Sequence, residues 1–577
     1  MMMAASMLAA TSCSDYSDYN EAVADATQSA NLTLWENIQQ TPELSDFASL
    51  VKRAGFADEL NATSSYTVWA PKNGTFDVSD YESLSNSALL QQFVKNHIAS
   101  YAHRASGTLE ERVLMLNEKS YDFAGTASYT FDGVPVVKAN VPSNNGVMHI
   151  LGGDAKFYPN LYEFVTDSIL AEGKDIDSLR NYFLRYERTY LDENASVVGP
   201  IVNGMQTWVD SVMVTTNSLW NTLNARINNE DSTYTFVMPT NTAWNEAYDN
   251  IKGYYKYAAK TVAQAYTSNG LSANNSQISI NNTYWQDSIT SRILTRYLIY
   301  SNNDAYNKWM IGGPSYSTPD SLRTTTRAKL SEPQYIVGSP REILAMSNGR
   351  ALIVDQLGMR SWDTYAPERT MNARNSTAYV SGGTQRNYTV AMRLADDKDE
   401  FSYTYIEATG YNKPEQVINL SNVLSTTYDI YCVFVPAYDQ LTLYPDTIWC
   451  PNRVIFTLSY CDAKGNLVEK EFLDESEENI SGFMKAFPSI RDNTTNAKTI
   501  RAFSNNPAII DTIFVGRFEF PVCYSGLGSN YCPTLKISTP FAATNRTLRT
   551  AFTRDLRIAS VIMKPKELVA YEESKKQ

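Results

Sequence analysis

The chain of 577 residues contains only 3 histidines and has no excess of positive charge. Its 49 Lys and Arg residues against 62 Asp and Glu residues give a net charge of −13. A nucleic-acid binder needs a basic surface to displace counterions from phosphates, so the acidity argues against a nucleic-acid partner. The same acidity opposes electrostatic docking on anionic lipid.

Long apolar runs are also missing. No stretch of about 18 apolar residues occurs, so the sequence predicts no membrane-spanning helix. Hydrophobic residues nevertheless make up 43% of the chain and 38 residues are tyrosine, which is too apolar and too aromatic for a disordered protein. At roughly 150 residues per domain, the length allows three or four folded domains.

Sequence motifs for catalysis, cofactors and metals are absent. The chain has no G-x-S-x-G elbow, no G-x-x-x-x-G-K-[ST] loop, no G-x-G-x-x-G after a strand and no H-E-x-x-H pair. Its six cysteines include no C-x-x-C pair. We therefore expect no enzymatic activity, no cofactor and no metal. A carboxylate pair for glycoside hydrolysis within 361–565 is the less favoured alternative.

The first thirteen residues, MMMAASMLAATSC, are small and apolar up to a cysteine. They resemble a bacterial lipoprotein signal, so we expect residues 1–13 to be a signal region and Cys13 to carry the lipid. Residues 14–30, polar and acidic at their start, would form a tether. This interpretation places the protein in the outer membrane of a Gram-negative bacterium, lipid-anchored and exposed at the cell surface. An ordinary buried N-terminal segment is the alternative.

Three motifs follow one another in the first part of the chain. A buried strand that ends at a proline, TVWAPKNGTF (67–76), precedes a helix with NHI (96–98) and then NGVMHILGG (145–153). This order resembles the fasciclin family, whose hallmarks are T-V-F-A-P-x-N-x-A-F, a central histidine and N-G-x-I-H-x-I-D. The resemblance covers about residues 31–165. It implies an α+β domain with a wedge-shaped sheet packed on helices.

A second copy of the pattern predicts an internal repeat. YTFVMPTNTAWNEAY (234–248) matches the first motif and NGRALIVDQL (348–357) matches the last. SITSRILTRYLIY (288–300) takes the place of the central helix. We expect a second fasciclin-like domain over 166–360, with an insertion near 250–286.

All three histidines fall in the first copy. The resemblance gives His97 and His149 structural positions, where one imidazole nitrogen donates a hydrogen bond and the other accepts one. His103 is expected in solvent. Trp69 and Trp244, which occupy the repeated first motif, are expected in the core.

Residues 361–565 are rich in short strand patterns, such as TYDIYCVFVPAY (427–438) and RVIFTLSYCDAKGNLVEKEFL (453–473). Strands at this density predict an all-β sandwich or a jelly-roll-like domain. The cysteines within these two runs are expected as small core residues, and disulfide pairing stays open. Residues 566–577 are assigned to a tail, whose end, EESKKQ (572–577), is predicted to be polar and frayed.

Exposed aromatic side chains are the best signal for ligand binding, because tyrosine and tryptophan stack on sugar rings and anchor protein interfaces. Candidates lie in the insertion and in nearby stretches rich in Asn, Ser and Gly. For the tyrosine cluster, simple packing of the inserted segment is the alternative. The candidate ligand-binding residues are Tyr254, Tyr255, Tyr257, Trp285, Tyr306, Trp309 and Tyr316.

The fasciclin resemblance implies cell adhesion and extracellular binding rather than turnover. We therefore predict a non-catalytic, lipid-anchored surface protein that recognises a glycan or a protein partner. The alternative is an accessory lipoprotein of an outer-membrane glycan importer, of the kind that pairs a TonB-dependent porin with lid and glycan-binding lipoproteins. An acidic tether, aromatic insertions and a β-sandwich would suit that role.

Overall fold

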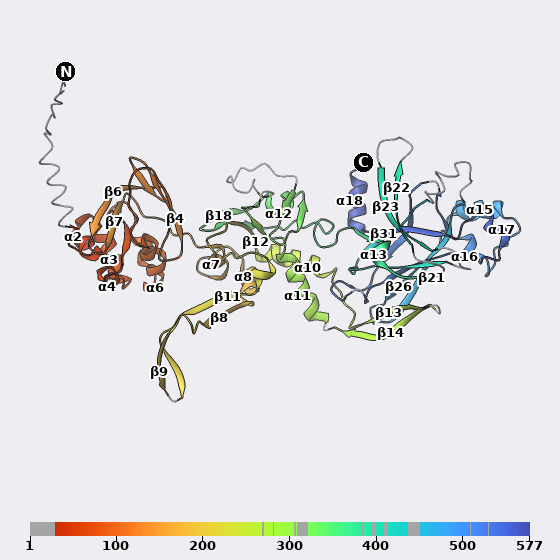
Figure 1. Cartoon of the computed structure of the whole chain (residues 1–577), viewed down its shortest axis with the longest axis horizontal. Helices are drawn as coiled ribbons and strands as arrows, with labels where there is room; N and C mark the ends of the chain where they lie inside the picture. The colour runs from red at the N-terminus through yellow and green to blue at the C-terminus, as the bar shows by residue number, and fades with distance from the viewer. Residues whose placement is uncertain are drawn as a thin grey trace, which may run out of the picture. The chain divides into compact units, whose positions relative to one another are not determined.

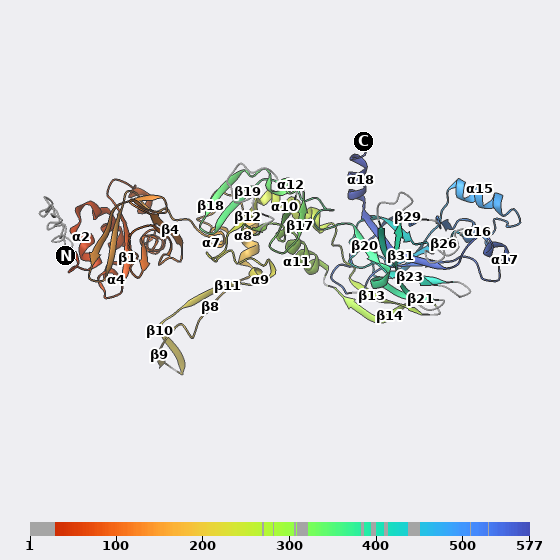
Figure 2. The same ribbon diagram turned by 45° about the horizontal axis from the view of Figure 1, so that its top comes forward.

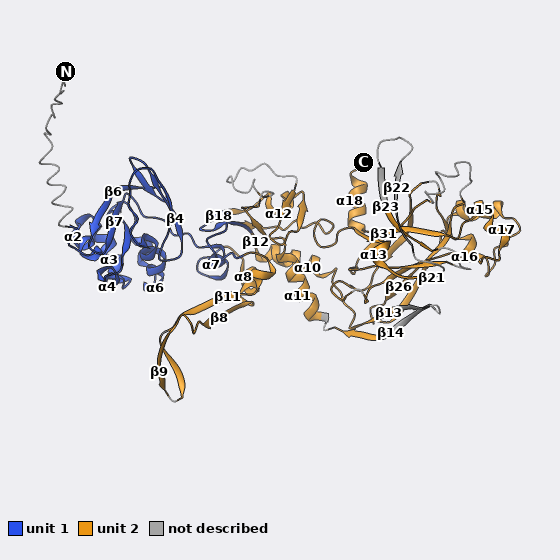
Figure 3. Cartoon of the chain, viewed as in Figure 1, with its two compact units in different colours: residues 1–173, 226–236, 343–351 blue, residues 174–225, 237–342, 352–577 orange. Residues whose placement is uncertain are grey.

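The computed structural model describes residues 29–577, apart from positions 203, 268–269, 281, 305–306, 308–320, 382–385, 394–399, 409–413, 437–449, 508 and 529. The chain divides into two compact units (Figure 3). Unit 1 comprises residues 1–173, 226–236 and 343–351, and unit 2 comprises residues 174–225, 237–342 and 352–577. Among the described residues, no helix combines the length and the apolar character that crossing a membrane requires.

Unit 1 begins with an α+β domain whose helices pack on one face of a sheet (Figure 1). Seven strands follow the order β2-β1-β7-β6-β5-β4-β3, with β1 and β7 parallel. The strands are β1 (Tyr66–Pro71), β2 (Ile98–Ser100), β3 (Leu109–Leu114), β4 (Ser120–Gly125), β5 (Tyr129–Phe131), β6 (Val134–Ser143) and β7 (Gly146–Leu151). The helical segments are α2 (Leu34–Gln40), η1 (Pro42–Leu44), α3 (Ser45–Arg53), α4 (Ala57–Asn61), α5 (Ser79–Glu82), α6 (Asn86–Leu89), η2 (Leu90–Val94) and η3 (Lys95–His97).

The position of β1 in this sheet explains why nearly all of its residues are buried. Successive side chains of a strand point to opposite faces of the sheet. Val68 and Ala70 pack in the core beneath the helices. Trp69 belongs to a second core on the other face, where its ring stacks on Phe131 at a centroid distance of 4.5 Å. Both faces of β1 are therefore covered.

One asparagine side chain joins three segments of this domain. Asn145 Oδ1 accepts a hydrogen bond from the Leu34 N–H at 2.8 Å. Its Nδ2 donates to the carbonyls of Leu60, at 2.9 Å, and Ala62, at 2.6 Å. Its own carbonyl accepts from the Tyr66 N–H at 3.2 Å. A single buried amide thus satisfies backbone groups at the start of α2 and the end of α4, next to β1.

The same arrangement recurs around Asn348. Its Oδ1 accepts from the Leu161 N–H at 2.9 Å, and its Nδ2 donates to the carbonyls of Ile227, at 2.7 Å, and Asn229, at 3.0 Å. The Tyr234 N–H donates to the Asn348 carbonyl at 3.0 Å. Each of these hydrogen bonds has a counterpart around Asn145, so the sequence repeat is also a structural repeat.

Glycine follows each asparagine because no side chain fits there. A Cβ on Gly146 would lie 2.0 Å from the carbonyl oxygen of Tyr66. A Cβ on Gly349 would lie 1.9 Å from the carbonyl oxygen of Tyr234. Both distances are far inside van der Waals contact, so the Asn-Gly pair is a packing requirement of both repeats.

The asparagine that follows each motif proline also has the same role twice. Asn73 Oδ1 accepts a hydrogen bond from the Asp46 N–H, in the first turn of α3, at 3.1 Å. Asn241 Oδ1 accepts from the Ser178 N–H, in the first turn of α8 (Asp177–Leu184), at 2.7 Å. These amides have no partner within their own helices, so the motif asparagine satisfies them.

A four-stranded sheet carries the second repeat. Its order, β15-β12-β19-β18, reproduces the order β2-β1-β7-β6 of the first domain. Trp244 is buried, as predicted. The remaining helices and strands of this region are α7 (Leu161–Thr166), α9 (Leu219–Thr222), β12 (Tyr234–Pro239), α10 (Asn241–Lys252), α11 (Asn282–Thr295), β15 (Ile299–Ser301), β16 (Ser321–Arg323), β17 (Lys329–Ser331), α12 (Gln334–Val337), β18 (Glu342–Met346) and β19 (Gly349–Val354). Between α8 and α9 lie β8 (Glu187–Leu191), β9 (Val197–Val202), β10 (Met205–Asp210) and β11 (Met213–Asn217).

The C-terminal part of unit 2 is a β-sandwich, as the strand patterns predicted. One sheet has the order β22-β23-β31-β25-β29 with β20 beside β31, and the other has the order β21-β24-β30-β26-β27 with β28 beside β26. A single core lies between the sheets, with Ile430 and Ile558 from the first sheet and Phe456 and Ile537 from the second. Cys432 and Cys461 were predicted to be in the core; both are buried there as free thiols.

The bounds of the sandwich strands follow the chain order. They are β20 (Arg369–Asn372), β21 (Thr377–Ser381), β22 (Arg386–Arg393), β23 (Glu400–Ala408), β24 (Glu415–Asn419), β25 (Thr427–Phe434), β26 (Arg453–Cys461), β27 (Leu467–Phe472), β28 (Phe503–Ser504), β29 (Asp511–Glu519), β30 (Thr534–Ser538) and β31 (Leu556–Pro565). The helices are α13 (Ala373–Ser376), α15 (Glu477–Ala486), α16 (Ala497–Ile500), α17 (Arg546–Arg549) and α18 (Lys566–Ser574).

The predicted insertion packs against the sandwich. It contains an antiparallel hairpin of β13 (Lys260–Thr267) and β14 (Gly270–Ser279). Ala258, just before the hairpin, is part of the sandwich core. Thr534 Oγ1 on β30 donates a hydrogen bond to Gln264 Oε1 at 3.1 Å. The insertion therefore contributes to the hydrophobic core of another part of unit 2.

Helix α18 occupies most of the segment that was assigned to the C-terminal tail. Tyr571 stacks on Trp362 at a centroid distance of 5.0 Å and an interplanar angle of 29°. Its hydroxyl donates to Glu332 Oε1 at 2.9 Å. The polar composition of the tail gave no sign of these contacts, because a single aromatic residue makes them.

His97 and His149 are structural, as predicted. His97 Nε2 accepts a hydrogen bond from the Ala155 N–H at 3.0 Å, so its Nδ1 donates to the carbonyl of Phe93 at 2.8 Å. His149 Nδ1 accepts from the Asn140 N–H at 3.3 Å, which leaves Nε2 as the donor. Burial lowers the pKa of both rings to about 4, because the charged form is poorly solvated there.

The expectation that His103 lies in solvent is wrong. Its side chain is 19% exposed, with Nδ1 2.7 Å from Glu111 Oε1 and Nε2 3.0 Å from the Ser100 carbonyl oxygen. Its own carbonyl accepts from His149 Nε2 at 2.9 Å. All three imidazoles are therefore used in packing the first domain.

Replacing Asn145 by Ala should destabilise the first domain by about 2–4 kcal/mol, because one N–H and two C=O groups lose their partner in a buried site. Asn348→Ala should have the same effect on the second repeat. Asn144→Ala changes an exposed neighbour and should cost less than about 0.5 kcal/mol. Differential scanning calorimetry of the full chain measures the shifts. Similar melting of the Asn145→Ala and Asn144→Ala variants would contradict the prediction.

Lowering the pH should decrease the free energy of unfolding of the first domain. Because the two folded pKa values, about 4, lie below the ordinary value of 6.5, the unfolded state binds more protons between these limits. Stability that is present above pH 6.5 is therefore lost as the pH falls towards 4, by about 3 kcal/mol per histidine. Amide exchange of β1 and β7 in the full chain measures this loss. His149→Gln should reduce it; an unchanged pH dependence would disprove the assignment.

Candidate functional site

The seven predicted ligand-binding aromatic residues fall into three groups. Tyr255 and Tyr257 are each 3% exposed, so the expectation that they stand at the surface is wrong. Tyr254 and Trp285 are half-buried, and ligand binding by them stays a prediction. The predicted residues that lie outside the described part of the chain are Cys13, Tyr306, Trp309 and Tyr316.

The buried tyrosines belong to a segment that is hydrogen-bonded to the sandwich. The Cys523 N–H donates to the Lys256 carbonyl at 2.6 Å. Tyr257 donates from its hydroxyl to the Ser525 carbonyl at 2.9 Å, and its ring lies 6.0 Å from that of Trp285. Packing of the inserted segment, the alternative explanation for this cluster, is what the structure shows. Only the partner residues, which lie far away in sequence between β29 and β30, reveal it.

A groove of about 350 Å³ lies in unit 2, where helix α12 meets the loop that follows β19. It contains one aromatic ring that is well exposed, Tyr335, at 45%. Sequence reasoning missed this residue, because a single tyrosine in a short helix carries no motif. The other residues that line the groove are Gln334, Ile336, Ser339, Asp355, Gln356 and Gly358.

An arginine and a glutamate hold the ring of Tyr335 in place. The guanidinium carbon of Arg360 lies 3.4 Å from the ring centroid. Arg360 Nη1 donates to Glu332 Oε2 at 2.6 Å, and the Tyr571 hydroxyl donates to Glu332 Oε1 at 2.9 Å. Hydrogen bonds from Tyr571 and Arg360 lower the pKa of Glu332, which keeps this carboxylate charged near neutral pH. The aromatic surface is therefore preorganised.

The rest of the groove is polar and close to neutral. Asp355 is paired with Arg341 at 3.0 Å. The side chains of Gln334, Ser339 and Gln356 form no hydrogen bond within the described part of the chain. A ring face with neutral donors and acceptors around it suits a polyhydroxylated ligand, which stacks its C–H face and exchanges hydrogen bonds at its rim.

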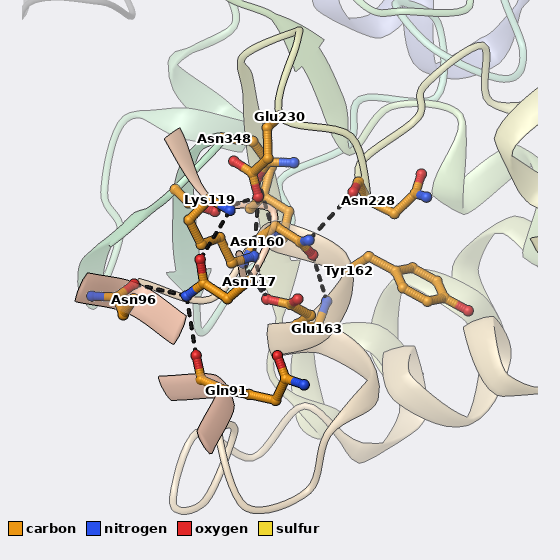
Figure 4. Close-up of polar contacts among 12 residues, drawn as sticks. Gln91, Asn96, Asn117, Lys119, Asn160, Tyr162, Glu163, Asn228, Glu230 and Asn348 are labelled. Carbon is orange, nitrogen blue, oxygen red and sulfur yellow. Dashed lines mark hydrogen bonds and ion pairs between the residues drawn. The ribbon is translucent and has the colours of Figure 1, made fainter. Parts of the chain in front are cut away.

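A second polar cluster, in unit 1, contains a buried lysine (Figure 4). Lys119, in the turn between β3 and β4, is 2% exposed and contacts two carboxylates. Its Nζ lies 2.7 Å from Glu163 Oε2 and 3.0 Å from Glu230 Oε1. Glu163 Oε2 also accepts from the Asn160 N–H at 2.8 Å, and Glu230 Oε1 accepts from the Ser347 hydroxyl at 2.9 Å.

This cluster joins the first domain to the start of the second repeat. Asn117 extends it, because its Nδ2 donates to Asn96 Oδ1 at 2.8 Å and to the Gln91 carbonyl at 3.1 Å (Figure 4). The ammonium of Lys119 is paired with two carboxylates. Lys119 therefore serves as an ionic junction between the segments and not as a nucleophile. Removing the lysine would leave Glu230, 11% exposed, without its counter-ion.

Two buried cysteines and the possible metal ligands are further candidate reactive groups. Burial raises the pKa of the Cys523 and Cys532 thiols to about 12, so neither forms a thiolate at neutral pH. Across the described ranges, no group of three or more His, Cys, Asp or Glu side chains is placed to hold a metal ion.

Comparison with solved structures gives similarities at low identity. A "FAS1 Domain Pair from the Insect Cell Adhesion Molecule Fasciclin I" is 13% identical over 56% of this chain and 98% of that chain, with a TM-score of 0.19. The CBM22-2 xylan-binding domain from Paenibacillus barcinonensis is 8% identical over 34% of this chain and 98% of that chain, also with a TM-score of 0.19. An exo-beta-1,3-galactanase from Phanerochaete chrysosporium is 7% identical over 77% and 78%, with a TM-score of 0.16.

The sequence comparisons are more specific. No curated protein matches the chain. A model of the Fasciclin domain family matches residues 42–152, which contain β1, β7 and all three histidines. The match lies inside the region of 31–165 that the three sequence motifs identified. Residues 42–152 therefore form a Fasciclin domain.

Proposed function

We propose that this chain is an extracellular binding or adhesion protein that acts without turnover. The observation that carries the proposal is the Fasciclin domain at residues 42–152. The fasciclin resemblance implies adhesion and binding. The histidines of this domain are committed to packing, and its buried lysine is committed to an ion pair, which supports a non-catalytic role.

The second repeat is part of the same proposal as a further fasciclin-like domain. Its motif asparagines, Asn241 and Asn348, make the hydrogen bonds that Asn73 and Asn145 make in the first domain. The strand order β15-β12-β19-β18 matches that of the first sheet. Tandem domains would extend the surface that is available to a ligand.

A neutral glycan is the ligand that the Tyr335 groove supports. The ring is exposed and held by Arg360, and the neighbouring side chains of Gln334 and Gln356 are free to hydrogen-bond hydroxyl groups. Sugar recognition commonly combines an aromatic platform with neutral amide groups of this kind. A protein partner is the other ligand class that the adhesion role allows.

A lipid on Cys13 would hold the protein at the outer membrane of a Gram-negative bacterium, exposed at the cell surface. The support is the sequence itself, in which small apolar residues lead to the cysteine and a polar, acidic segment follows. The alternative role, as an accessory lipoprotein of a TonB-dependent glycan importer, shares this anchor. Stoichiometric co-purification of a large porin in mild detergent would favour the importer, and its absence would favour adhesion.

Tyr335→Ala should weaken binding of neutral oligosaccharides by the full chain about tenfold, the equivalent of about 1.4 kcal/mol, because the stacking surface is lost. Tyr284→Ala removes a ring that is 69% exposed and lies outside the groove, and should leave binding unchanged. A glycan array followed by calorimetry measures both variants. Binding that survives Tyr335→Ala would place the glycan site elsewhere, and a wild-type chain that binds no glycan would favour a protein partner.

Cys13→Ser should release the protein from the membrane fraction, because a serine cannot form the thioether to the lipid. Labelling with a clickable fatty acid and fractionation of the cells measure both effects, and the wild-type chain should carry label. Cys450→Ser, which changes a cysteine at the other end of the chain, is the matched control and should keep both label and location. A labelled Cys13→Ser variant would disprove the anchor.

A further inference from the structure

A long β-arm leaves the body of unit 2 between helices α8 and α9 (Figure 1, Figure 2). At its base, β8 pairs with β11 in antiparallel register from Glu187–Asn217 to Leu191–Met213. At its tip, β9 pairs with β10, with Val202 opposite Met205. Each ladder has only two strands in the described chain. We call residues 187–217 the arm.

The tip of the arm is apolar and exposed on both faces. Of the seventeen large hydrophobic side chains that are exposed in the described residues, eight lie on the arm. Val197 and Val198 are neighbours on one strand and therefore point to opposite faces, yet they are 53% and 61% exposed. The other exposed apolar residues of the tip are Ile201, Val202, Met205 and Val209.

Such a surface is unusual for a chain that works alone. Contiguous exposed apolar patches on monomers are small and commonly mark interaction sites. A single apolar face would suit a flat partner surface. A hairpin with two apolar faces needs surroundings that cover both faces. Either a protein cleft or the hydrocarbon of a membrane would do so.

The open edges of the arm favour a protein cleft over an apolar medium. Neither β9 nor β10 has a further strand beside it in the described chain, so no strand pairs the backbone groups along the outer edge of either. In the hydrocarbon of a bilayer, each such group costs several kcal/mol, and open sheet edges do not occur there. A protein cleft can instead pair these groups with a strand of its own. Pro200 removes one donor from β9, which makes the edge of β10 the better one for pairing.

The charges of the arm define the partner further. No residue between Glu193 and Asp210 is charged, and Asp192 and Glu193 place negative charge between β8 and the tip. A second copy of this chain would bring the same acidic residues together, and its net charge of −13 would oppose the contact. A cleft that is apolar inside and basic at its mouth is complementary to both parts of the arm.

We propose that the arm inserts into a partner protein, whose cleft is apolar and uncharged inside, basic at its rim, and bordered by a strand that pairs with β10. The residues on which this proposal rests lie outside the Fasciclin domain and outside the Tyr335 groove. The inference therefore goes beyond the binding role proposed above, and it holds whether or not the groove binds a glycan.

Photo-crosslinking in the native cells tests the proposal. A photoreactive phenylalanine analogue replaces Ile201 or Val209 on the two strands of the tip, or Ile169, which is 79% exposed outside the arm, as the matched control. We expect one and the same protein to be linked from positions 201 and 209, but not from 169. Crosslinked peptides should lie in an apolar cleft with a basic rim. With a crosslinker at 209, Ile201→Glu should lower the yield at least about tenfold, and Ile169→Glu should leave it within about twofold.

Two measurements on the purified full chain complete the test. Light scattering should show a monomer, and flotation with neutral phosphatidylethanolamine–phosphatidylglycerol vesicles should show no binding by a chain without its lipid. In the isolated complex, amide exchange of β10 should slow at least about tenfold. Self-association that Ile201→Glu abolishes, vesicle binding through the tip, equal crosslinking from position 169, or unprotected β10 amides would each overturn the proposal. Loss of glycan binding in Tyr335→Ala with intact crosslinking would separate the two sites.

Discussion

A buried asparagine amide holds each repeat of this protein together. Asn145 and Asn348 each bond one N–H group and two C=O groups that belong to segments far apart in the sequence. Buried backbone groups without partners would cost about 1–3 kcal/mol each. The asparagine side chain therefore allows these segments to pack together without leaving such groups unsatisfied. The following glycine is required by the same contact, because a Cβ would strike the carbonyl of the neighbouring strand. The Asn-Gly pair is therefore the point on which the sheet and its helices depend.

The residues that pack the core of the first domain are not the ones proposed to bind partners. In the first domain, Trp69, Phe131 and His149 are stacked within the core and His97 is fully buried, so these rings are unavailable to a ligand. Recognition falls to surfaces outside this core, namely the Tyr335 groove and the arm. They differ in chemistry, since the groove offers one ring with neutral polar groups, and the arm offers apolar side chains with open backbone edges. We propose a glycan for the first and a protein cleft for the second, so that one chain would bind two kinds of partner.

The motifs of the first domain could be read from the sequence because their residues have no substitutes. Proline ends β1, asparagine satisfies a helix terminus, and glycine admits a close backbone approach. Each role requires one residue type at a fixed position in the sequence. The strands of the sandwich were equally visible, since alternating or continuous apolar runs follow from burial on one or two faces. The exposure of Tyr255 and Tyr257 was misjudged because the segment around them packs on Ser525 and Cys523, which lie more than 260 residues away. Lys119 was missed for the same reason, since its partners come from α7 and from Glu230.

The sequence by itself determined the Fasciclin domain, the existence of a repeat and the β-sandwich, because local patterns of burial and turn chemistry encode them. Only the tertiary structure decided which aromatic rings are exposed, where the ionic junction lies and that the insertion completes the sandwich core. It also decided that residues 187–217 stand out as an arm, although their apolar side chains look in sequence like those of any buried hairpin. The physical reason is that exposure is a property of what packs against a segment. The periodicity of a segment can be read from its own residues, whereas the segments that pack against it cannot.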